Sequence, residues 1–521
     1  YKKINEGYLG LFGLFFLIIY SYISNFFYPH DIAHNIVLLV VGIIFYFTFK
    51  NRNKDFVLTF IIFSILFIAL IIIKTHDDFP YYHFPYTYYL TQNKLMFGIG
   101  NFNHGFRTPS SIFYLNSLYY LPYINFFFFH MGSILIMGFV NIILLKKLYD
   151  FKFEKINFIF FFILLSLLFI NVFFYRIGEH GTDRSAQILV FLFIIELSLL
   201  LSFRKFDQTL LTKILLLSAL IISLKAFYIL YLSYFIIVFL FFLEFSNFKK
   251  IILVLKNLKF FYFFILLFFL VLFTNFANTG CLLYPVKFLC FETSWSIPIN
   301  EVIEMNNWYE QWSKGGATPN FRVDNPEVYI QKFNWLSNWI DVYFFNKVSD
   351  FLLSLILLCI IFLILFYNNK KNKLVIKKEF LYLYFLSIIL FFEWLYNHPA
   401  LRYGGYVLIS LLIFLPISFL LDCFMQNKKK IYSKIKFLLI LFLIIFLGRN
   451  FDRINNEVKK YQFQPFLDNN FRISDNHFRI KNNMDKIIKN YQSCKNKNII
   501  CDKDLSLKVY EINNRYYFSR K

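Results

Sequence analysis

Long apolar runs alternate with short polar segments along most of the chain. A membrane-spanning α-helix needs about 20 predominantly apolar residues, and several of these runs reach that length. We predict that the chain is an all-α polytopic membrane protein. Its thirteen predicted spans lie at residues 8–27, 34–49, 56–73, 123–145, 157–175, 187–203, 209–224, 226–245, 259–276, 350–367, 380–396, 404–422 and 434–448.

Composition supports this fold class. The chain has 521 residues, of which 58% are hydrophobic and only 16% are charged. A soluble domain could not bury that much apolar surface, whereas a bilayer can cover it. The sequence therefore argues against a soluble protein.

The formal net charge of +23 would suit a nucleic-acid partner, but the distribution of the charge argues against one. Alternate short segments are rich in Lys and Arg, whereas the short segments between them hold only Arg176, Arg184, Lys225 and Arg402. By the positive-inside rule we predict a cytoplasmic N-terminus and, after thirteen spans, a C-terminus outside. We expect membrane lipids and no nucleic acid among the partners.

Three longer segments fall on the predicted outer side, at residues 74–122, 277–349 and 449–521. We assign residues 1–448 to a transmembrane domain that includes the first two segments. Residues 449–521 are polar and are assigned to a periplasmic tail or small cap. The first segment is aromatic-rich and partly amphipathic, so we expect one or two helices in it that lie along the membrane interface.

Two pairs of cysteines are close in sequence on this side: Cys281 with Cys290, and Cys494 with Cys501. Disulfides form in oxidising compartments such as a periplasm. We predict both disulfides. Free thiols are the alternative, and a zinc site has little histidine nearby to support it.

Asp77 and Asp78 follow the apolar run that ends at Ile73. Ionised groups near hydrocarbon lose hydration, so carboxylates kept at such a boundary usually face a cavity and have a function. The pair could supply a general base, a metal ligand or a helix N-cap. Two like charges this close would raise at least one pKa, which suits a base. With His76 and His83 the acids could bind a divalent cation, but no ligand set decides this, and the cofactor stays unassigned.

A second polar cluster, with Glu179, Asp183 and Arg184, lies between two predicted spans on the same side. It could instead be a solvated turn with a weak ion pair. Most of the arginines fall on the predicted outer side, and the planar guanidinium fork suits phosphate. Lys225, between two apolar runs, could favour an anionic headgroup or simply extend to the interface. The membrane-proximal candidates for a lipid-linked phosphate are Arg107, Arg176, Arg184 and Arg402.

The motif Asp78-x-x-x-Tyr82-His83-x-Pro85, directly after an early span, resembles the first outer loop of the GT-C superfamily of integral-membrane glycosyltransferases. The likeness is to bacterial members that modify cell-surface polysaccharide or lipid A. The segment from His398 to Gly404, with Arg402 and Tyr403, is similar to an Arg-Tyr element near the donor phosphate. The chain departs from the family pattern in having two extra spans before the acidic loop.

The resemblance implies a GT-C-like fold in a bacterial inner membrane, with the site facing the periplasm. It implies transfer of a sugar from a polyprenyl-phosphate donor to a glycan, lipid or protein acceptor. Asp78 would be the catalytic base, and Asp77 or Asp183 would orient the acceptor. Arg402, Lys225 and Arg184 would stabilise the leaving phosphate. The remaining candidates for substrate binding are Tyr82, His83, Arg107, Glu179 and Tyr403.

Two other classes stay open at this point. An O-antigen polymerase or ligase also binds lipid-linked sugars through arginines on the outer side. In those proteins, however, the main arginine-containing loops come later in the sequence, and the early acidic loop is absent. A transporter or flippase of lipid-linked sugars would usually show inverted repeats, broken helices and charges buried within its spans.

Overall fold

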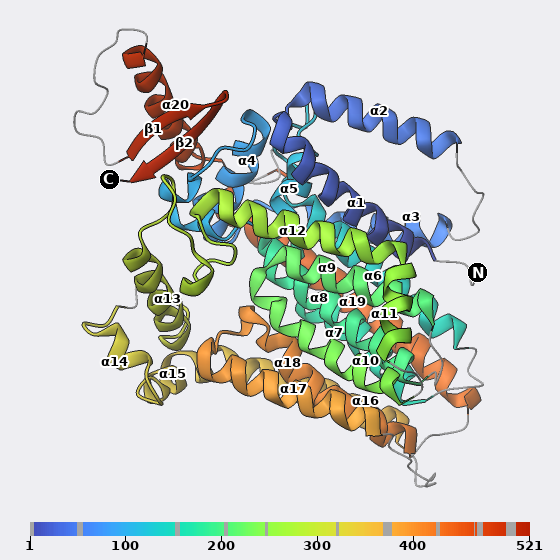
Figure 1. The fold of residues 1–521 in the computed structure, drawn as a ribbon. Helices are drawn as coiled ribbons and strands as arrows, with labels where there is room; N and C mark the ends of the chain where they lie inside the picture. Colours follow the sequence, from blue (N-terminus) through green and yellow to red (C-terminus); the bar gives the residue numbers. More distant parts are fainter. Residues whose placement is uncertain are drawn as a thin grey trace.

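The computed structural model of the protein describes residues 5–48, 56–151, 157–202, 207–244, 248–318, 322–367, 378–423, 428–462, 464–465, 473–495 and 507–520. Within these ranges the regular secondary structure is helical apart from one β-hairpin and isolated bridges. Figure 1 shows one helical bundle with the longer connecting segments gathered on its left side. We call this the loop end of the bundle; it carries residues 71–130, 277–318, 322–348, 473–495 and 507–520.

The described residues include nine helical segments that are long and apolar enough to cross a membrane. They contain α1 (Glu6–Phe27), α6 (Met131–Asp150), α8 (Ile177–Ser202), η4 (Ala226–Ser233) with α10 (Tyr234–Leu243), α12 (Lys259–Thr279), α15 (Leu336–Trp339) with η6 (Ile340–Val348) and α16 (Ser349–Phe366), α17 (Lys378–Asn397), α18 (Gly405–Cys423) and α19 (Lys428–Tyr461). Four shorter apolar helices match the other predicted spans: α2 (Ile32–Thr48), α3 (Phe56–Leu70), α7 (Phe158–Phe173) and α9 (Gln208–Leu224). The protein is thus a helical, polytopic membrane protein; thirteen spans and their orientation stay predictions.

The core of the bundle lies around α7, α8 and α9. The side chains of α7 are buried from Phe158 to Ile170, and α8 packs on both α6 and α9. Between apolar helices in lipid, close packing by small residues replaces the usual hydrophobic driving force. A Cβ atom at Gly7 of α1 would lie 2.5 Å from Ile143 of α6, so only glycine allows this approach. By contrast, Asn35 is the one buried residue of α2. The apolar side chains of α2 are not buried within the protein and can contact lipid.

Three chain segments build the loop end. The first contains η1 (Phe79–His83), α4 (Phe84–Gln92), η2 (Ile99–Asn101), η3 (His104–Arg107) and α5 (Ser111–Ser117). The second contains η5 (Lys287–Leu289), α13 (Ile299–Lys314) and α14 (Pro326–Ile330), followed by α15 and η6. The third contains α20 (Asp475–Lys495), β1 (Leu507–Ile512) and β2 (Arg515–Arg520), and η7 (Leu401–Tyr403) joins α17 to α18. At the opposite end, the short amphipathic helix α11 (Phe248–Asn257) precedes α12.

The first loop segment contains two short α-helices, α4 and α5, where the sequence predicts one or two helices. Both α4 and α5 are largely buried between other parts of the protein, and their place relative to the membrane interface stays a prediction. Helix α4 packs against α5, η1 and α20. The aromatic residues of this segment therefore fill a protein core.

Two boundaries differ from the sequence prediction. The span predicted at 123–145 begins only at Met131, because residues 123–130 form turns whose Phe129 packs with Phe79 and Phe84. Helix α19 has 34 residues and runs through the predicted domain boundary at 448. Several lysines and arginines behind the predicted orientation lie outside the described residues, among them Lys50, Arg52, Lys54, Lys370 and Lys371.

The C-terminal segment adds a small β-hairpin to the predicted helices. Strands β1 and β2 pair in antiparallel register from Leu507 with Arg520 to Ile512 with Arg515. Asn513 and Asn514 connect them with φ of 50° and 58°, as a type I′ hairpin turn requires. Figure 1 shows the hairpin beside α4 and the end of α12. The Arg515 guanidinium donates to the carbonyls of Phe26 and Leu95 at 2.6 and 3.1 Å, so the hairpin is anchored to the first helix.

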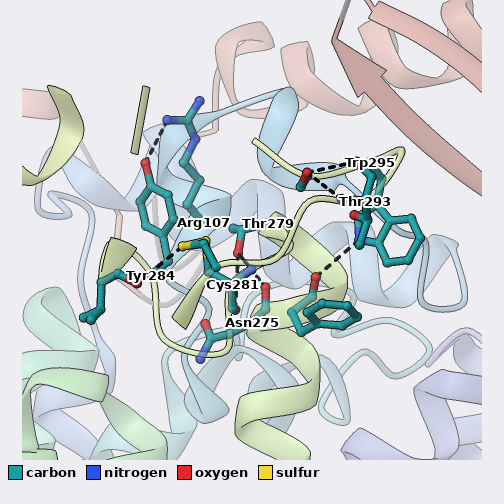
Figure 2. Close-up of a disulfide and its surroundings, with 11 residues drawn as sticks. Arg107, Asn275, Thr279, Cys281, Tyr284, Thr293 and Trp295 are labelled. Atoms are coloured by element: carbon teal, nitrogen blue, oxygen red, sulfur yellow. Dashed lines mark hydrogen bonds between the residues drawn. A yellow bond between two sulfur atoms is a disulfide. The ribbon is translucent and has the colours of Figure 1, made fainter. Parts of the chain in front are cut away.

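The predicted Cys281–Cys290 disulfide is present and closes a turn directly after α12. Figure 2 shows it beside Tyr284, with Thr279 and Asn275 on the end of α12. Cys501 lies outside the described residues, so the second pair, Cys494 with Cys501, stays a prediction.

Candidate active site

Asp78 lies at the loop end, in the short connection between α3 and η1. It occupies the position before the first residue of η1, but its carboxylate makes no capping hydrogen bond there. Helix capping therefore does not explain this residue. Its backbone N–H instead donates to His76 Nδ1 at 3.2 Å, and its side chain is about one-quarter exposed (24%).

Arg402 joins the two acidic segments that the sequence singled out. Its Nη2 lies 2.5 Å from Asp78 Oδ2, and its Nε donates to Asp183 Oδ2 at 2.9 Å. The other oxygen of Asp183 accepts from the Lys225 ammonium. Asp78, Arg402, Asp183 and Lys225 thus form one alternating chain of charges, which we call the ionic cluster.

Each member of the ionic cluster comes from a different connection or helix end. Asp183 follows Gly181, where non-helical backbone angles kink α8. Lys225 is the residue at which α9 ends and η4 begins, and its Nζ lies 4.5 Å from the ring centroid of Tyr403. Arg402 belongs to η7 and is followed by Gly404, whose φ of 101° is a backbone conformation that favours glycine. Helix ends that meet at the loop end therefore supply all four charges.

The guanidinium of Arg402 is held from several directions. Its Cζ atom lies 5.4 Å from the ring centroid of Trp312 on α13 and 5.7 Å from that of Tyr403. Its backbone carbonyl accepts from Gln187 Nε2 at 3.1 Å, and the preceding N–H donates to the Tyr343 hydroxyl at 2.9 Å. The position of the arginine is thus set by the bundle and by the second loop segment together.

These charges determine the ionisation of Asp78. Burial raises the pKa of its carboxyl, but Arg402, followed by His83 and His76, outweighs burial and leaves the pKa well below the ordinary value. The sequence had suggested a raised pKa from the neighbouring Asp77. The opposite result has a simple cause, since Asp77 is exposed while Arg402 contacts Asp78 directly. Asp78 is therefore ionised at neutral pH.

Tyr82 and His83 lie against the ionic cluster, as the motif around Asp78 suggests. The Tyr82 hydroxyl donates to Asp78 Oδ2 at 3.4 Å, and the His83 ring lies 4.4 Å from the Tyr82 ring. Burial lowers the pKa of His83 to about 4, so its imidazole is neutral. Its Nε2 is buried without a hydrogen-bond partner among the described residues and could donate to, or accept from, a bound molecule.

Three other predicted site residues lie in separate contacts. Arg107 is buried and binds the Tyr284 hydroxyl at 3.0 Å and Glu301 at 2.6 Å; Figure 2 shows it above Tyr284. Glu179 precedes the Gly181 kink and pairs with Arg176 at 2.6 Å. Arg184 packs its guanidinium 5.7 Å from the Phe174 ring centroid. Asp183 and Arg184 are adjacent in sequence but point in different directions around α8.

Sequence reasoning missed Gln187, Trp312 and Tyr343, which hold Arg402 in place. Gln187 lies four residues after Asp183, on the same face of α8, and helical spacing could have indicated it. Trp312 and Tyr343 come from the second loop segment, and only the folded arrangement brings them to Arg402. Nothing in their local sequence points to that contact.

A metal site was one interpretation of the acids near His76 and His83. Within the described ranges, no group of three or more His, Cys, Asp or Glu side chains is arranged to hold a metal ion. The nearest cation to the Asp78 carboxylate is the guanidinium of Arg402.

The fold and the ionic cluster define a polytopic helical membrane protein with a charged site at one end of its bundle. Over residues 6–409 the chain matches the model of a family described as "Domain of unknown function (DUF8201)", and it belongs to that family. The match covers Asp78, Asp183, Lys225 and Arg402 and ends before α19. No curated protein and no solved structure matches the chain.

Proposed function

We propose that this protein is a membrane glycosyltransferase that moves a sugar from a polyprenyl-phosphate donor to an acceptor hydroxyl. The observation that carries the proposal is the contact of Arg402 with both Asp78 and Asp183, next to Lys225. It places an ionised carboxylate, which can accept a proton, beside two cations, which can bind a phosphate. Transfer of a glycosyl group from a lipid phosphate needs both of these.

The reaction would proceed by displacement at the anomeric carbon. A carboxylate oxygen of Asp78 accepts the proton of the acceptor hydroxyl while that oxygen forms a bond to the anomeric carbon. The bond between this carbon and the phosphate oxygen breaks, and the electron pair leaves with the lipid phosphate. Arg402 and Lys225 stabilise the charge that develops on the phosphate, and Asp183 holds both cations in position.

Arg402 keeps the pKa of Asp78 low although burial raises it. A phosphate that binds Arg402 competes with the Asp78 carboxylate for the same guanidinium. Loss of that contact removes the main charge that lowers the pKa of Asp78, while burial continues to raise it. Donor binding would therefore convert a paired carboxylate into a better base.

An apolar groove beside α3 supports a lipid substrate. The groove has a volume of about 570 Å³ and lies between α3 and α19. Helix α3 leads directly into the segment that carries Asp78, and two groove residues, Phe60 and Phe67, are 64% and 54% exposed. We propose that the prenyl chain lies in this groove, with its phosphate at the loop end. In this proposal the loop end faces the periplasm of a bacterial inner membrane.

The test is transfer by the purified full chain in lipid nanodiscs. The donors would be decaprenyl phosphates that carry radiolabelled glucose, galactose, mannose or arabinose, with an extract of envelope glycolipids as acceptor. Asp78→Asn should abolish transfer to the acceptor, while Asp77→Asn should retain it because Asp77 is exposed and outside the ionic cluster. Equal transfer by Asp78→Asn and the unaltered protein would overturn the proposal.

A further inference from the structure

Three tyrosines follow one another at a spacing of three residues in and just after η4: Tyr228, Tyr231 and Tyr234. A 3₁₀ helix has three residues per turn, so this spacing puts their rings on one face. The ring centroid of Tyr231 lies 5.2 Å from that of Tyr228 and 6.0 Å from that of Tyr234. The row starts three residues after Lys225, next to the ionic cluster.

The three hydroxyls have different surroundings. Tyr234 has a partner within the protein, Ser387 Oγ at 2.8 Å. The hydroxyls of Tyr228 and Tyr231 are buried, and neither has a hydrogen-bond partner in the described part of the chain. The two residues are 0% and 4% exposed. Buried hydroxyls are nearly always paired in native proteins, so these two are available to pair with a bound molecule or with water.

Gly404 leaves room beside these hydroxyls. A Cβ atom at Gly404 would have the Tyr231 hydroxyl, at 3.5 Å, and the Tyr228 ring and hydroxyl, at 3.7 Å, as its nearest neighbours. A methyl-sized group would therefore fit there at ordinary contact distance from the two hydroxyls.

His398 adds a third unpaired polar atom to this region. Its buried Nδ1 has no hydrogen-bond partner among the described residues. Burial, assisted by Lys314 and Lys225, lowers the pKa of His398 to about 4, so the imidazole is neutral. The His398 ring lies 6.0 Å from the ring of Tyr403 and 5.9 Å from that of Phe227. Neutral polar atoms and aromatic faces thus meet beside the two cations.

We propose that Tyr228, Tyr231 and His398 form a subsite that binds the hydroxyl groups of a sugar whose phosphate lies at Lys225 and Arg402. A sugar hydroxyl both donates and accepts, so it can satisfy a tyrosyl hydroxyl or a neutral imidazole. A prenyl chain would leave all three polar atoms unpaired. The inference rests on the proposed function. It identifies these three residues as the part of the site that selects the sugar.

The experiment measures binding by the full chain in nanodiscs. The probes are decaprenyl phosphate alone and decaprenyl phosphates that carry glucose, galactose, mannose or arabinose. The variants are Tyr228→Phe and Tyr231→Phe, each of which removes one unpaired hydroxyl and keeps the ring. Tyr234→Phe is the matched control, since it removes a hydroxyl that Ser387 already pairs.

We expect the unaltered protein to bind at least one sugar-bearing probe more tightly than decaprenyl phosphate alone. Tyr228→Phe and Tyr231→Phe should each reduce that preference about tenfold, as loss of one ligand hydrogen bond does. Neither should lower the unfolding temperature, because no protein contact is lost. Tyr234→Phe should keep the preference and unfold at a lower temperature.

Two results would overturn the subsite. One is equal binding of all five probes, which would leave lipid-phosphate binding and the proposed function intact. The other is a sugar preference that both tyrosine variants retain, which would mean that water alone completes these hydroxyls. If no probe binds, including decaprenyl phosphate, the proposed function itself fails.

Discussion

Arg402 contacts Asp78 at 2.5 Å although 324 residues separate them in the chain. The contact joins the first loop segment to η7, and the second nitrogen of the same guanidinium reaches Asp183 on α8. One planar side chain therefore fixes the relative positions of three parts of the loop end. This geometry needs two nitrogens at a fixed separation, which arginine has and lysine lacks.

Replacing Arg402 by lysine tests whether the positive charge at this position is sufficient or whether the forked geometry of the guanidinium is also needed. A single ammonium cannot bind Asp78 and Asp183 as the fork does, so we expect Arg402→Lys to reduce sugar transfer about 100-fold, the typical effect of losing one group that stabilises a transition state. Initial rates in nanodiscs give the measurement. Arg449→Lys is the control, because Arg449 packs 4.0 Å from the Tyr175 ring centroid, outside the ionic cluster. Full activity of Arg402→Lys would show that positive charge alone is sufficient.

The pKa of Asp78 predicts a defined pH window. A carboxyl whose pKa is lower in the folded protein contributes stability above its unfolded pKa, about 3.9, and loses it as the pH falls through the folded pKa. We expect the unaltered protein to exceed Asp78→Asn in unfolding free energy by about 2 kcal/mol at pH 7. The difference should be constant from pH 6 to 8 and shrink below about pH 4. Thermal unfolding in detergent at each pH measures it; a difference that shrinks already at pH 6 would contradict the low pKa.

The network around Arg107 predicts a structural role for that residue. Glu301 binds the buried Arg107 at 2.6 Å and the partly exposed Arg520 at 2.8 Å. Glu301→Gln removes the charge that pairs Arg107, so we expect destabilisation of about 3 kcal/mol. Arg520→Gln should lower the stability by less than about 1 kcal/mol, because exposed ion pairs are weak. Both unfolding temperatures are measured against the unaltered protein, and the reverse ranking would contradict this account.

The disulfide gives a test of orientation that is independent of the enzyme proposal. If the loop end faces an oxidising periplasm, Cys281 and Cys290 should resist maleimide labelling in intact cells until a reductant is added. Replacing both cysteines by serine should lower the unfolding free energy by about 3 kcal/mol, because the open chain gains entropy when the short ring is absent. Labelling without reductant would indicate a reducing compartment and would oppose the predicted topology.

The apolar runs predicted most of the helical bundle, because a helix that lies in lipid is specified by its own composition. The individual charged residues of the ionic cluster could also be identified from the sequence, since a charged residue at the end of an apolar helix is conspicuous among its neighbours. The pairing of Arg402 with Asp78 could not be identified from the sequence, because it depends on how helix ends that are distant in the chain meet in the fold.

The dependence on distant contacts also explains why some predicted site residues lie outside the ionic cluster. Glu179 and Asp183 are only four residues apart, but the kink at Gly181 separates their surroundings. Arg107 resembled a phosphate ligand by type and position, yet Glu301 and Tyr284 from the second loop segment engage it. The hairpin around Asn513 and Asn514 had a usable local signal, an alternating strand pattern with a two-residue turn.

The anchoring of Arg515 to Phe26 and Leu95 has a consequence for the order of events during synthesis. Residues 507–520 leave the ribosome after all of the helices they contact, so the hairpin can dock only when the bundle has been inserted. The loop end is therefore assembled in two stages, first an open bundle and then its closure by β1 and β2. Nascent chains halted before residue 507 would carry the ionic cluster without that closure.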